Sequence, residues 1–193
     1  QHNFLLVDEL VRLAVRDFGG DQSRIFVTGQ SYGGRGAWEY AASRPHMFAG
    51  IVPVAASLQP TPALVAAIDP RTPVWAFHGA NDASSDVRQS DMWVAALRSQ
   101  PDREAPADTV RYTKYEEAPD AMTAEGELYA VGHGAYELAY KDERLWEWLR
   151  GRSCARCRVG IVETERAQKK SRRSRRRRRK KKKKKKAEPK VNL

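Results

Sequence analysis

Three short segments of this 193-residue chain carry side chains that could act together in acyl transfer. Ser31 stands in the pentapeptide G-Q-S-Y-G, Asp82 ends the pentapeptide H-G-A-N-D, and His133 lies between two glycines. A hydroxyl, a carboxylate and an imidazole can supply a nucleophile, its general base and the group that orients the base. The three residues are far apart in the sequence, so this chemistry requires a fold that brings their loops together.

The segment around Ser31 has the pattern of a nucleophile elbow. An apolar run at 25–28 ends in the G-Q-S-Y-G pentapeptide and passes into a helical pattern at 35–43. A G-x-S-x-G motif needs this order of strand, sharp turn and helix, because the turn raises the serine hydroxyl above the end of a sheet. Gly29 and Gly33 carry no Cβ, so we expect both to let the strand and the helix approach closely.

Asp82 and His133 each follow a predicted strand, as Ser31 does. The apolar runs at 73–77 and 128–131 are predicted to be strands and lead directly into the two loops. The carboxyl ends of parallel strands meet at one edge of a sheet, where α/β folds carry their sites. We therefore expect all three residues at that edge.

Apolar segments of two kinds alternate along the first part of the chain. Helices are predicted at 4–18, 34–43, 63–68, 90–99 and 142–150, strands at 25–28, 50–55, 73–77, 109–115 and 128–131, and a loop insertion at 118–126. This alternation predicts an α/β fold with a mainly parallel sheet and helices on both faces. The apolar runs are shorter than the roughly 20 residues of a transmembrane helix.

Charge divides the chain into two unlike parts. Residues 1–150 have a net charge of −7 and residues 151–193 a net charge of +18, which together give the +11 of the whole chain. We predict a globular domain over 1–150 and a basic, mostly disordered low-complexity tail over 151–193. The run Arg175 to Lys186 consists of arginine and lysine alone.

The basic tail has three interpretations. It could bind nucleic acid without sequence specificity by counterion release, or act as a nuclear import signal. It could be attracted to an anionic membrane surface. In the third interpretation the run is not a selected protein sequence.

Cys154 and Cys157 are the two cysteines of the chain. One Cys-x-x-Cys pair without a second pair or accompanying histidines is weak evidence for metal or redox chemistry. We interpret the pair as incidental thiols, and we expect no metal ion and no organic cofactor.

Taken together, the motifs resemble those of the phospholipase/carboxylesterase and dienelactone-hydrolase-like group of α/β-hydrolases. The chain order serine, aspartate, histidine is that of this superfamily. T-G-Q-S-Y-G-G followed by G-x-W resembles the elbow of the group, H-G-A-N-D its acid loop, and G-H ahead of L-W-E-W-L its histidine loop and last helix. The resemblance covers residues 3–150 and is closest to esterases and predicted peptidases, including feruloyl-esterase-like and polyhydroxybutyrate-depolymerase-like members.

This resemblance implies Ser31 as the nucleophile, His133 as general base and acid, and Asp82 as the partner of His133. The backbone N–H of Tyr32 is then one oxyanion donor. The group takes its second donor from an upstream loop, which we expect to precede Gln1 together with several strands, so that the chain is N-terminally truncated. The implied activity is hydrolysis of a small-molecule carboxylic ester, or of a peptide or thioester, through an acyl-serine.

Alternatives remain open at several positions. Asp86 is a second candidate acid, although its offset from His-Gly fits less well than that of Asp82. His78 is predicted to be structural and to pack its own loop. The side chains of Tyr32 and Gln30 are candidates for substrate contact. The alternative function is a catalytically inactive hydrolase remnant whose tail binds nucleic acid or anionic surfaces.

Overall fold

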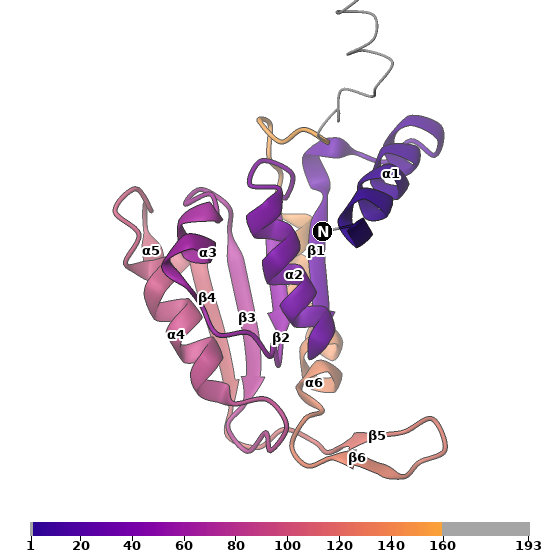
Figure 1. Cartoon of the computed structure of the whole chain (residues 1–193), viewed down its shortest axis with the longest axis vertical. Helices are drawn as coiled ribbons and strands as arrows, with labels where there is room; N and C mark the ends of the chain where they lie inside the picture. The colour runs from indigo at the N-terminus through magenta and orange to yellow at the C-terminus, as the bar shows by residue number, and fades with distance from the viewer. Residues whose placement is uncertain (1, 160–193) are drawn as a thin grey trace, which may run out of the picture. The chain divides into compact units, whose positions relative to one another are not determined.

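The structure is a computed structural model that describes residues 2–159, and its central element is a sheet of four parallel strands (Figure 1). The elements in chain order are α1 (His2–Asp17), the short 3-10 helix η1 (Gln22–Arg24), β1 (Phe26–Gln30), α2 (Tyr32–Ser43), β2 (Gly50–Val54), α3 (Pro62–Ala67), β3 (Val74–Gly79), α4 (Val87–Arg98), α5 (Pro106–Thr109), β4 (Val110–Tyr115), β5 (Ala121–Met122), β6 (Leu128–Ala130), α6 (Ala135–Lys141) and α7 (Glu143–Arg150). The strands of the main sheet lie in the order β1-β2-β3-β4. The predicted α/β fold with a mainly parallel sheet is confirmed.

The central strand β2 contains a proline. Toward β3, the N–H of Ile51 donates to the carbonyl of Pro73 at 3.0 Å, and the N–H of Ala55 donates to that of Phe77 at 2.8 Å. Pro53 stands midway between these two donors and has no N–H. The proline therefore removes one ladder bond, while the donors on either side hold β2 against β3.

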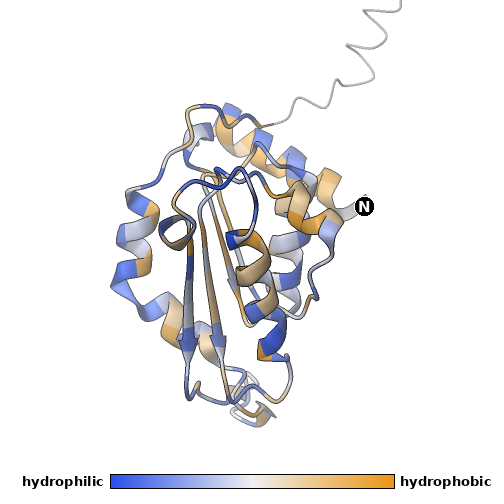
Figure 2. Cartoon of the chain, turned by 90° about the vertical axis from the view of Figure 1, so that its left-hand side faces the viewer, coloured by the Kyte–Doolittle hydropathy of each residue, from blue (hydrophilic) through white to orange (hydrophobic). Residues whose placement is uncertain are grey.

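The helices α1 to α4 contribute to the hydrophobic core on one face of the sheet. The buried residues of this cluster include Trp38, Tyr40, Ile51, Val74, Trp93 and Leu97. Trp38 of α2 and Trp93 of α4 stack with their ring centroids 4.2 Å apart and their planes at 5°. Figure 2 shows hydrophobic and hydrophilic residues alternating along the helices, as expected for amphipathic helices.

The helices α6 and α7 cover the other face. Trp75 and Phe77 of β3 pack there with Leu145 and Trp148 of α7. Trp148 is buried against the sheet, whereas Trp146 is 44% exposed. The helical turn directs these two side chains to different sides of α7.

The segment before His133 differs from the prediction. The expected loop insertion contains β5, which pairs with β6 in an antiparallel hairpin separate from the main sheet. The predicted strand at 128–131 is therefore not a strand of the parallel sheet. Leu128 and Tyr129 are exposed, so the apolar pattern there does not mark a buried strand. The hairpin lies near the edge at which the parallel strands end (Figure 1).

The two cysteines form a disulfide bond, so their interpretation as incidental thiols is wrong. The Cα atoms of Cys154 and Cys157 are 5.2 Å apart. The N–H of Cys154 donates to the carbonyl of Ser23 at 2.8 Å, and the N–H of Arg158 donates to the carbonyl of His46 at 2.9 Å. These two hydrogen bonds hold the segment against the start of β1 and β2.

The compact unit extends through Val159, past the predicted domain boundary at residue 150. The basic run and the rest of 160–193 lie outside the described residues, so the predictions for the tail remain predictions. Among the residues that the structure describes, no helix is both long enough and apolar enough to cross a membrane.

Candidate active site

Ser31 lies at a strained turn between β1 and α2. Its backbone has φ 58° and ψ −119°, and a residue with a side chain adopts such a conformation at a cost of roughly 1–3 kcal/mol. The N–H of Ser31 donates to the carbonyl of Val54 in β2 at 3.0 Å, and the carbonyl of Ser31 accepts from the N–H of Arg35 at 2.9 Å. The neighbouring strand and the following helix thus hold the turn in the geometry that the G-x-S-x-G motif requires.

The absence of a side chain at Gly29 makes this turn sterically possible. The absence of a side chain at Gly33 does not contribute to it. A Cβ at Gly29 would lie 2.4 Å from the backbone carbon and oxygen of Gly33, far inside van der Waals contact. A Cβ at Gly33 would meet nothing within 4 Å. The prediction that both glycines are needed for close approach is wrong for Gly33, because only its backbone faces Gly29. The close contact on the helix side is made by Gly34, which the motif does not include. A Cβ added there would lie 2.8 Å from the carbonyl oxygen of Val54.

His133 and Asp82 are joined by a buried hydrogen bond. The ring Nδ1 of His133 lies 2.7 Å from Oδ2 of Asp82, and the two side chains are 1% and 0% exposed. An ionised carboxylate only accepts hydrogen bonds, so Nδ1 carries the proton and Nε2 of the neutral ring keeps its lone pair. Asp86 instead caps α4 and pairs with Arg88. Of the two candidate acids, Asp82 is the one that contacts His133 within the described residues.

The surroundings of Asp82 favour its ionised form. The N–H groups of Ser84 and Ser85 both donate to Oδ1 at 2.8 Å, and Nε2 of His78 lies 3.4 Å from Oδ2. Burial raises the pKa of Asp82, but the hydrogen bonds from His78, His133 and the two N–H groups outweigh burial and hold this pKa below its usual value. The carboxylate therefore remains negative at neutral pH and can stabilise a positive imidazolium beside it.

The loop of His133 packs against both other loops. The side-chain amide of Gln30 donates to the carbonyl of His133 at 3.2 Å, which links this loop to the residue before Ser31. Gly132 has φ +66°, and a Cβ there would lie 2.4 Å from the carbonyl oxygen of Asn81. A glycine at this position therefore allows the histidine loop to lie directly on the acid loop.

The structure places the loops of the three predicted residues at the carboxyl edge of the sheet and brings Asp82 and His133 into direct contact. Ser31 follows β1, Asp82 follows β3, and His133 follows the hairpin beside this edge (Figure 1). Within residues 2–159, no hydrogen bond joins Oγ of Ser31 to His133. Such bonds are often long without substrate and tighten when substrate binds.

Tyr32 and Gln30 occupy different positions in this arrangement. Tyr32 is the first residue of α2, so its N–H has no acceptor in the preceding turn of the helix. Its side chain is 77% exposed. The amide of Gln30 is bonded to the histidine loop, a contact that the sequence motif does not reveal.

In the described part of the chain, no group of three or more His, Cys, Asp or Glu side chains could hold a metal ion.

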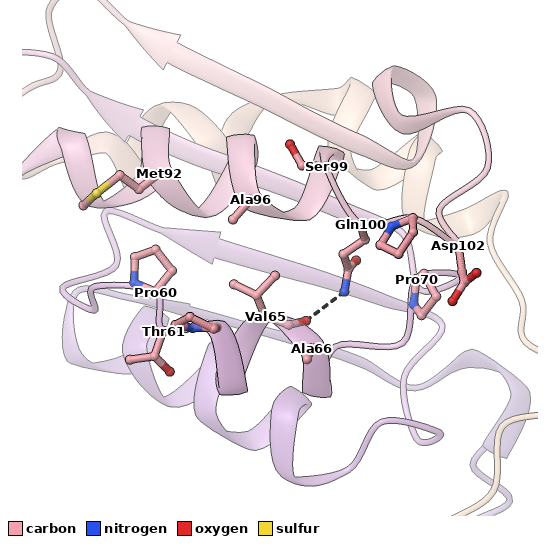
Figure 3. Close-up of a pocket in the computed structure, with 12 residues that line it drawn as sticks. Pro60, Thr61, Val65, Ala66, Pro70, Met92, Ala96, Ser99, Gln100 and Asp102 are labelled. Atoms are coloured by element: carbon pink, nitrogen blue, oxygen red, sulfur yellow. Dashed lines mark hydrogen bonds between the residues drawn. The ribbon is translucent and has the colours of Figure 1, made fainter.

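A groove of about 590 Å³ lies between α3 and α4 (Figure 3). Its lining includes Pro60, Val65, Ala66, Pro70, Met92 and Ala96. The side-chain amide of Gln100 donates to the carbonyl of Val65 at 2.8 Å within it. Ser31, Asp82 and His133 do not line this groove, so it is separate from the candidate active site.

Known proteins with similar sequences and structures have the same kind of fold. A solved structure described as a thermostable esterase matches 79% of this chain and 37% of its own, with 27% identity and a TM-score of 0.64. A "Putative Dienelactone Hydrolase" from Klebsiella pneumoniae matches 75% of this chain and 59% of its own, with 25% identity and a TM-score of 0.55. The chain therefore has an α/β-hydrolase fold. The predicted resemblance to the esterase and dienelactone-hydrolase-like members of that superfamily is confirmed.

Curated sequences support the same assignment. A protein of Salmonella typhimurium named "Putative carboxymethylenebutenolidase" is 31% identical over 151 residues, which are 74% of this chain and 52% of that protein. The chain thus spans about half the length of the curated relatives it matches. No protein-family model matches the chain.

Proposed function

We propose that this chain carries the catalytic residues of a serine hydrolase that cleaves carboxylic esters. The observation that carries the proposal is the buried 2.7 Å hydrogen bond between Asp82 and His133, on a loop that Gln30 ties to the strained turn of Ser31. The names of the relatives, carboxymethylenebutenolidase and esterase, support an ester as the substrate class. The competing hypothesis is a catalytically inactive remnant.

In the first half of the proposed reaction, Oγ of Ser31 attacks the ester carbonyl carbon while Nε2 of His133 takes the hydroxyl proton. The carbonyl oxygen becomes an oxyanion and accepts a hydrogen bond from the N–H of Tyr32, the first residue of α2. Asp82 stabilises the imidazolium and keeps its orientation. His133 then gives the proton to the leaving alcohol, and an acyl-serine remains.

In the second half, a water molecule replaces the alcohol. Nε2 of His133 takes a proton from the water as its oxygen attacks the acyl carbon. The second tetrahedral intermediate collapses, His133 returns the proton to Oγ of Ser31, and the carboxylic acid leaves. The ester C–O bond is broken at the cost of one water, without oxidation or reduction.

Labelling with a fluorophosphonate probe tests the nucleophile. We expect the chain to be labelled at Ser31, and the Ser31→Ala variant to remain unlabelled. Ser99→Ala is the matched control, because Ser99 is an exposed hydroxyl at the end of α4, and it should be labelled as the wild type is. Absence of labelling in the wild type, or equal labelling of Ser31→Ala, would favour the inactive remnant.

Hydrolysis of chromogenic esters with acyl groups of increasing size tests the reaction. Asp82→Asn removes the acceptor that fixes the proton on Nδ1 of His133, and we expect kcat to fall by about 10⁴-fold, as in other serine hydrolases. Mass spectrometry of the quenched reaction should find the acyl group on the peptide that contains Ser31. Parallel assays with thioesters and peptides determine which acyl compound the site prefers.

A further inference from the structure

A second histidine, His78, contacts the same carboxylate oxygen of Asp82 that His133 contacts. Nε2 of His78, at the end of β3, lies 3.4 Å from Oδ2 of Asp82 and 3.0 Å from the backbone carbonyl oxygen of Ser85. Its other ring nitrogen, Nδ1, lies 2.7 Å from the hydroxyl of Ser90 in α4. The His78 side chain is fully buried, and Ser85 and Ser90 are also buried.

These contacts determine the tautomer of His78. The carbonyl oxygen of Ser85 and the carboxylate of Asp82 only accept hydrogen bonds, so Nε2 carries the proton, which it donates to Ser85 while Oδ2 of Asp82 lies 3.4 Å from the same nitrogen. The hydroxyl of Ser90 can then donate to Nδ1, which leaves the ring neutral with every polar atom partnered. A neutral ring also avoids a further buried charge beside Asp82 and His133.

Asp82 is consequently held by three hydrogen bonds and a close contact with His78. Its Oδ1 accepts from the N–H groups of Ser84 and Ser85, and its Oδ2 accepts from His133 and lies 3.4 Å from Nε2 of His78. The backbone donors fix one oxygen, and the two histidines contact the other. A carboxylate with both oxygens engaged cannot rotate about its terminal bond without breaking a buried hydrogen bond.

We propose that His78 is a positioning residue, which holds Asp82 in the orientation that aligns the His133 ring with Ser31, and that Ser90 holds His78 in turn. This inference rests on the proposed function, because it assigns a role in the same reaction. It also extends the role that the sequence pattern predicts for His78, packing of its own loop. The chain from α4 through β3 to the histidine loop is continuous: Ser90, His78, Asp82, His133.

Two substitutions separate positioning from packing. His78→Leu removes the donor to Asp82, whereas His78→Gln retains an amide nitrogen that can reach the same place. We expect His78→Leu to lower kcat per active site roughly 10- to 100-fold with little change in KM, since small misplacements of a catalytic group have effects of this size. His78→Gln should recover most of this loss. Active sites are counted by fluorophosphonate titration, so unfolded molecules do not enter the rate.

The ionisation of His133 supplies a readout that a packing role would not change. The groups that face its ring or loop are Asp82, which binds Nδ1, and Asp120, whose carboxylate accepts from the N–H of Gly132. Loss of the His78 donor leaves more negative charge on Oδ2 of Asp82, which favours the protonated His133 ring. The acid limb of the pH–rate profile in His78→Leu should therefore move to higher pH.

NMR of isotope-labelled histidine measures the same ionisation in the resting protein, without substrate. The His133 signal is assigned by its loss in His133→Gln, and its titration should move upward in His78→Leu and return in His78→Gln. If the wild type is catalytically inactive but this shift occurs, the proposed function fails and the coupling of His78 to His133 stands. If the wild type is active but kcat per site and the His133 titration are unchanged in His78→Leu, the inference is overturned.

Ser90→Ala provides an independent test if His78→Leu does not fold. It removes the hydroxyl that holds Nδ1 of His78 and leaves both histidines in place. We expect a smaller decrease in kcat, several-fold, and a shift of the His133 titration in the same direction. Wild-type kcat and an unchanged titration in Ser90→Ala would overturn the inference.

Discussion

Replacement of Gly29 by alanine is the most direct test of the turn that carries Ser31. The added Cβ would lie 2.4 Å from the backbone carbon and oxygen of Gly33. Ordinary contacts of a Cβ begin at 3.4 Å, so β1 and the start of α2 must separate by about 1 Å. Both contacting groups are backbone and cannot change rotamer, so the cost lies at the upper end of overpacking, about 3 kcal/mol.

Gly33→Ala is the matched control because it adds the same methyl group to the other glycine of the motif. The new Cβ meets nothing within 4 Å, and Gly33 is in the first turn of α2. Alanine favours a helix over glycine by up to about 1 kcal/mol, so this variant should be as stable as the wild type or more stable. The two variants should therefore differ by about 3–4 kcal/mol in the free energy of unfolding.

Urea denaturation followed by circular dichroism measures this difference, and thermal unfolding gives a second estimate. For a chain of this length, 3 kcal/mol corresponds to a decrease in Tm of roughly 6–12 °C. If Gly29→Ala is as stable as Gly33→Ala, the close approach of strand and helix at this turn is not as we describe it. If Gly33→Ala is the more damaging of the two, the assignment of the steric constraint to Gly29 is wrong.

Two further predictions concern charge and the disulfide. Burial raises the pKa of Asp69, but hydrogen bonds from Arg71 and the charges of Arg156 and Arg71 outweigh burial and lower it to about 2. Because the folded value is lower than the unfolded one, the ionised Asp69 stabilises the fold above about pH 4, and this contribution is lost as the pH falls toward 2. Asp69→Asn should lower the free energy of unfolding by about 2 kcal/mol at pH 7. Urea titrations at pH 3 should find a smaller difference in the free energy of unfolding between the variant and the wild type. An equal loss at both pH values would contradict the electrostatic cause. Reduction of the disulfide between Cys154 and Cys157 should lower the free energy of unfolding by about 2 kcal/mol, because the loop that it closes is short. The variant with alanine at both positions should not respond to dithiothreitol. A wild type whose urea midpoint does not change in dithiothreitol would refute this prediction.

Local sequence patterns were sufficient for the four strands of the main sheet and for the elbow. The apolar runs that became β1, β2, β3 and β4 are short and bounded by turn residues, and a buried strand needs little more than this. The strained turn at Ser31 was also predictable, because a serine between a strand and a helix with glycine two positions before it has few backbone solutions. The choice of Asp82 over Asp86 followed from its offset within one loop.

Contacts between distant segments could not be predicted in the same way. Which glycine of the elbow carries the steric constraint depends on how α2 lies on β1, and the sequence motif treats both alike. The apolar pattern at 128–131 has the same appearance in a hairpin as in a parallel sheet, so only the pairing with β5 distinguished the two. The cysteines pair within a local turn, in which the N–H of Cys157 donates to the carbonyl of Cys154 at 3.0 Å, but only the hydrogen bonds to Ser23 and His46 place that turn against the sheet.

The same distinction applies to the candidate site. Ser31, Asp82 and His133 could be selected by residue type and position after predicted strands, since each depends on its own loop. The support of Asp82 by His78, and of the histidine loop by Gln30, arises where side chains from separate elements meet. Such contacts depend on the three-dimensional packing of loops that are far apart in the chain, which a one-dimensional pattern does not encode.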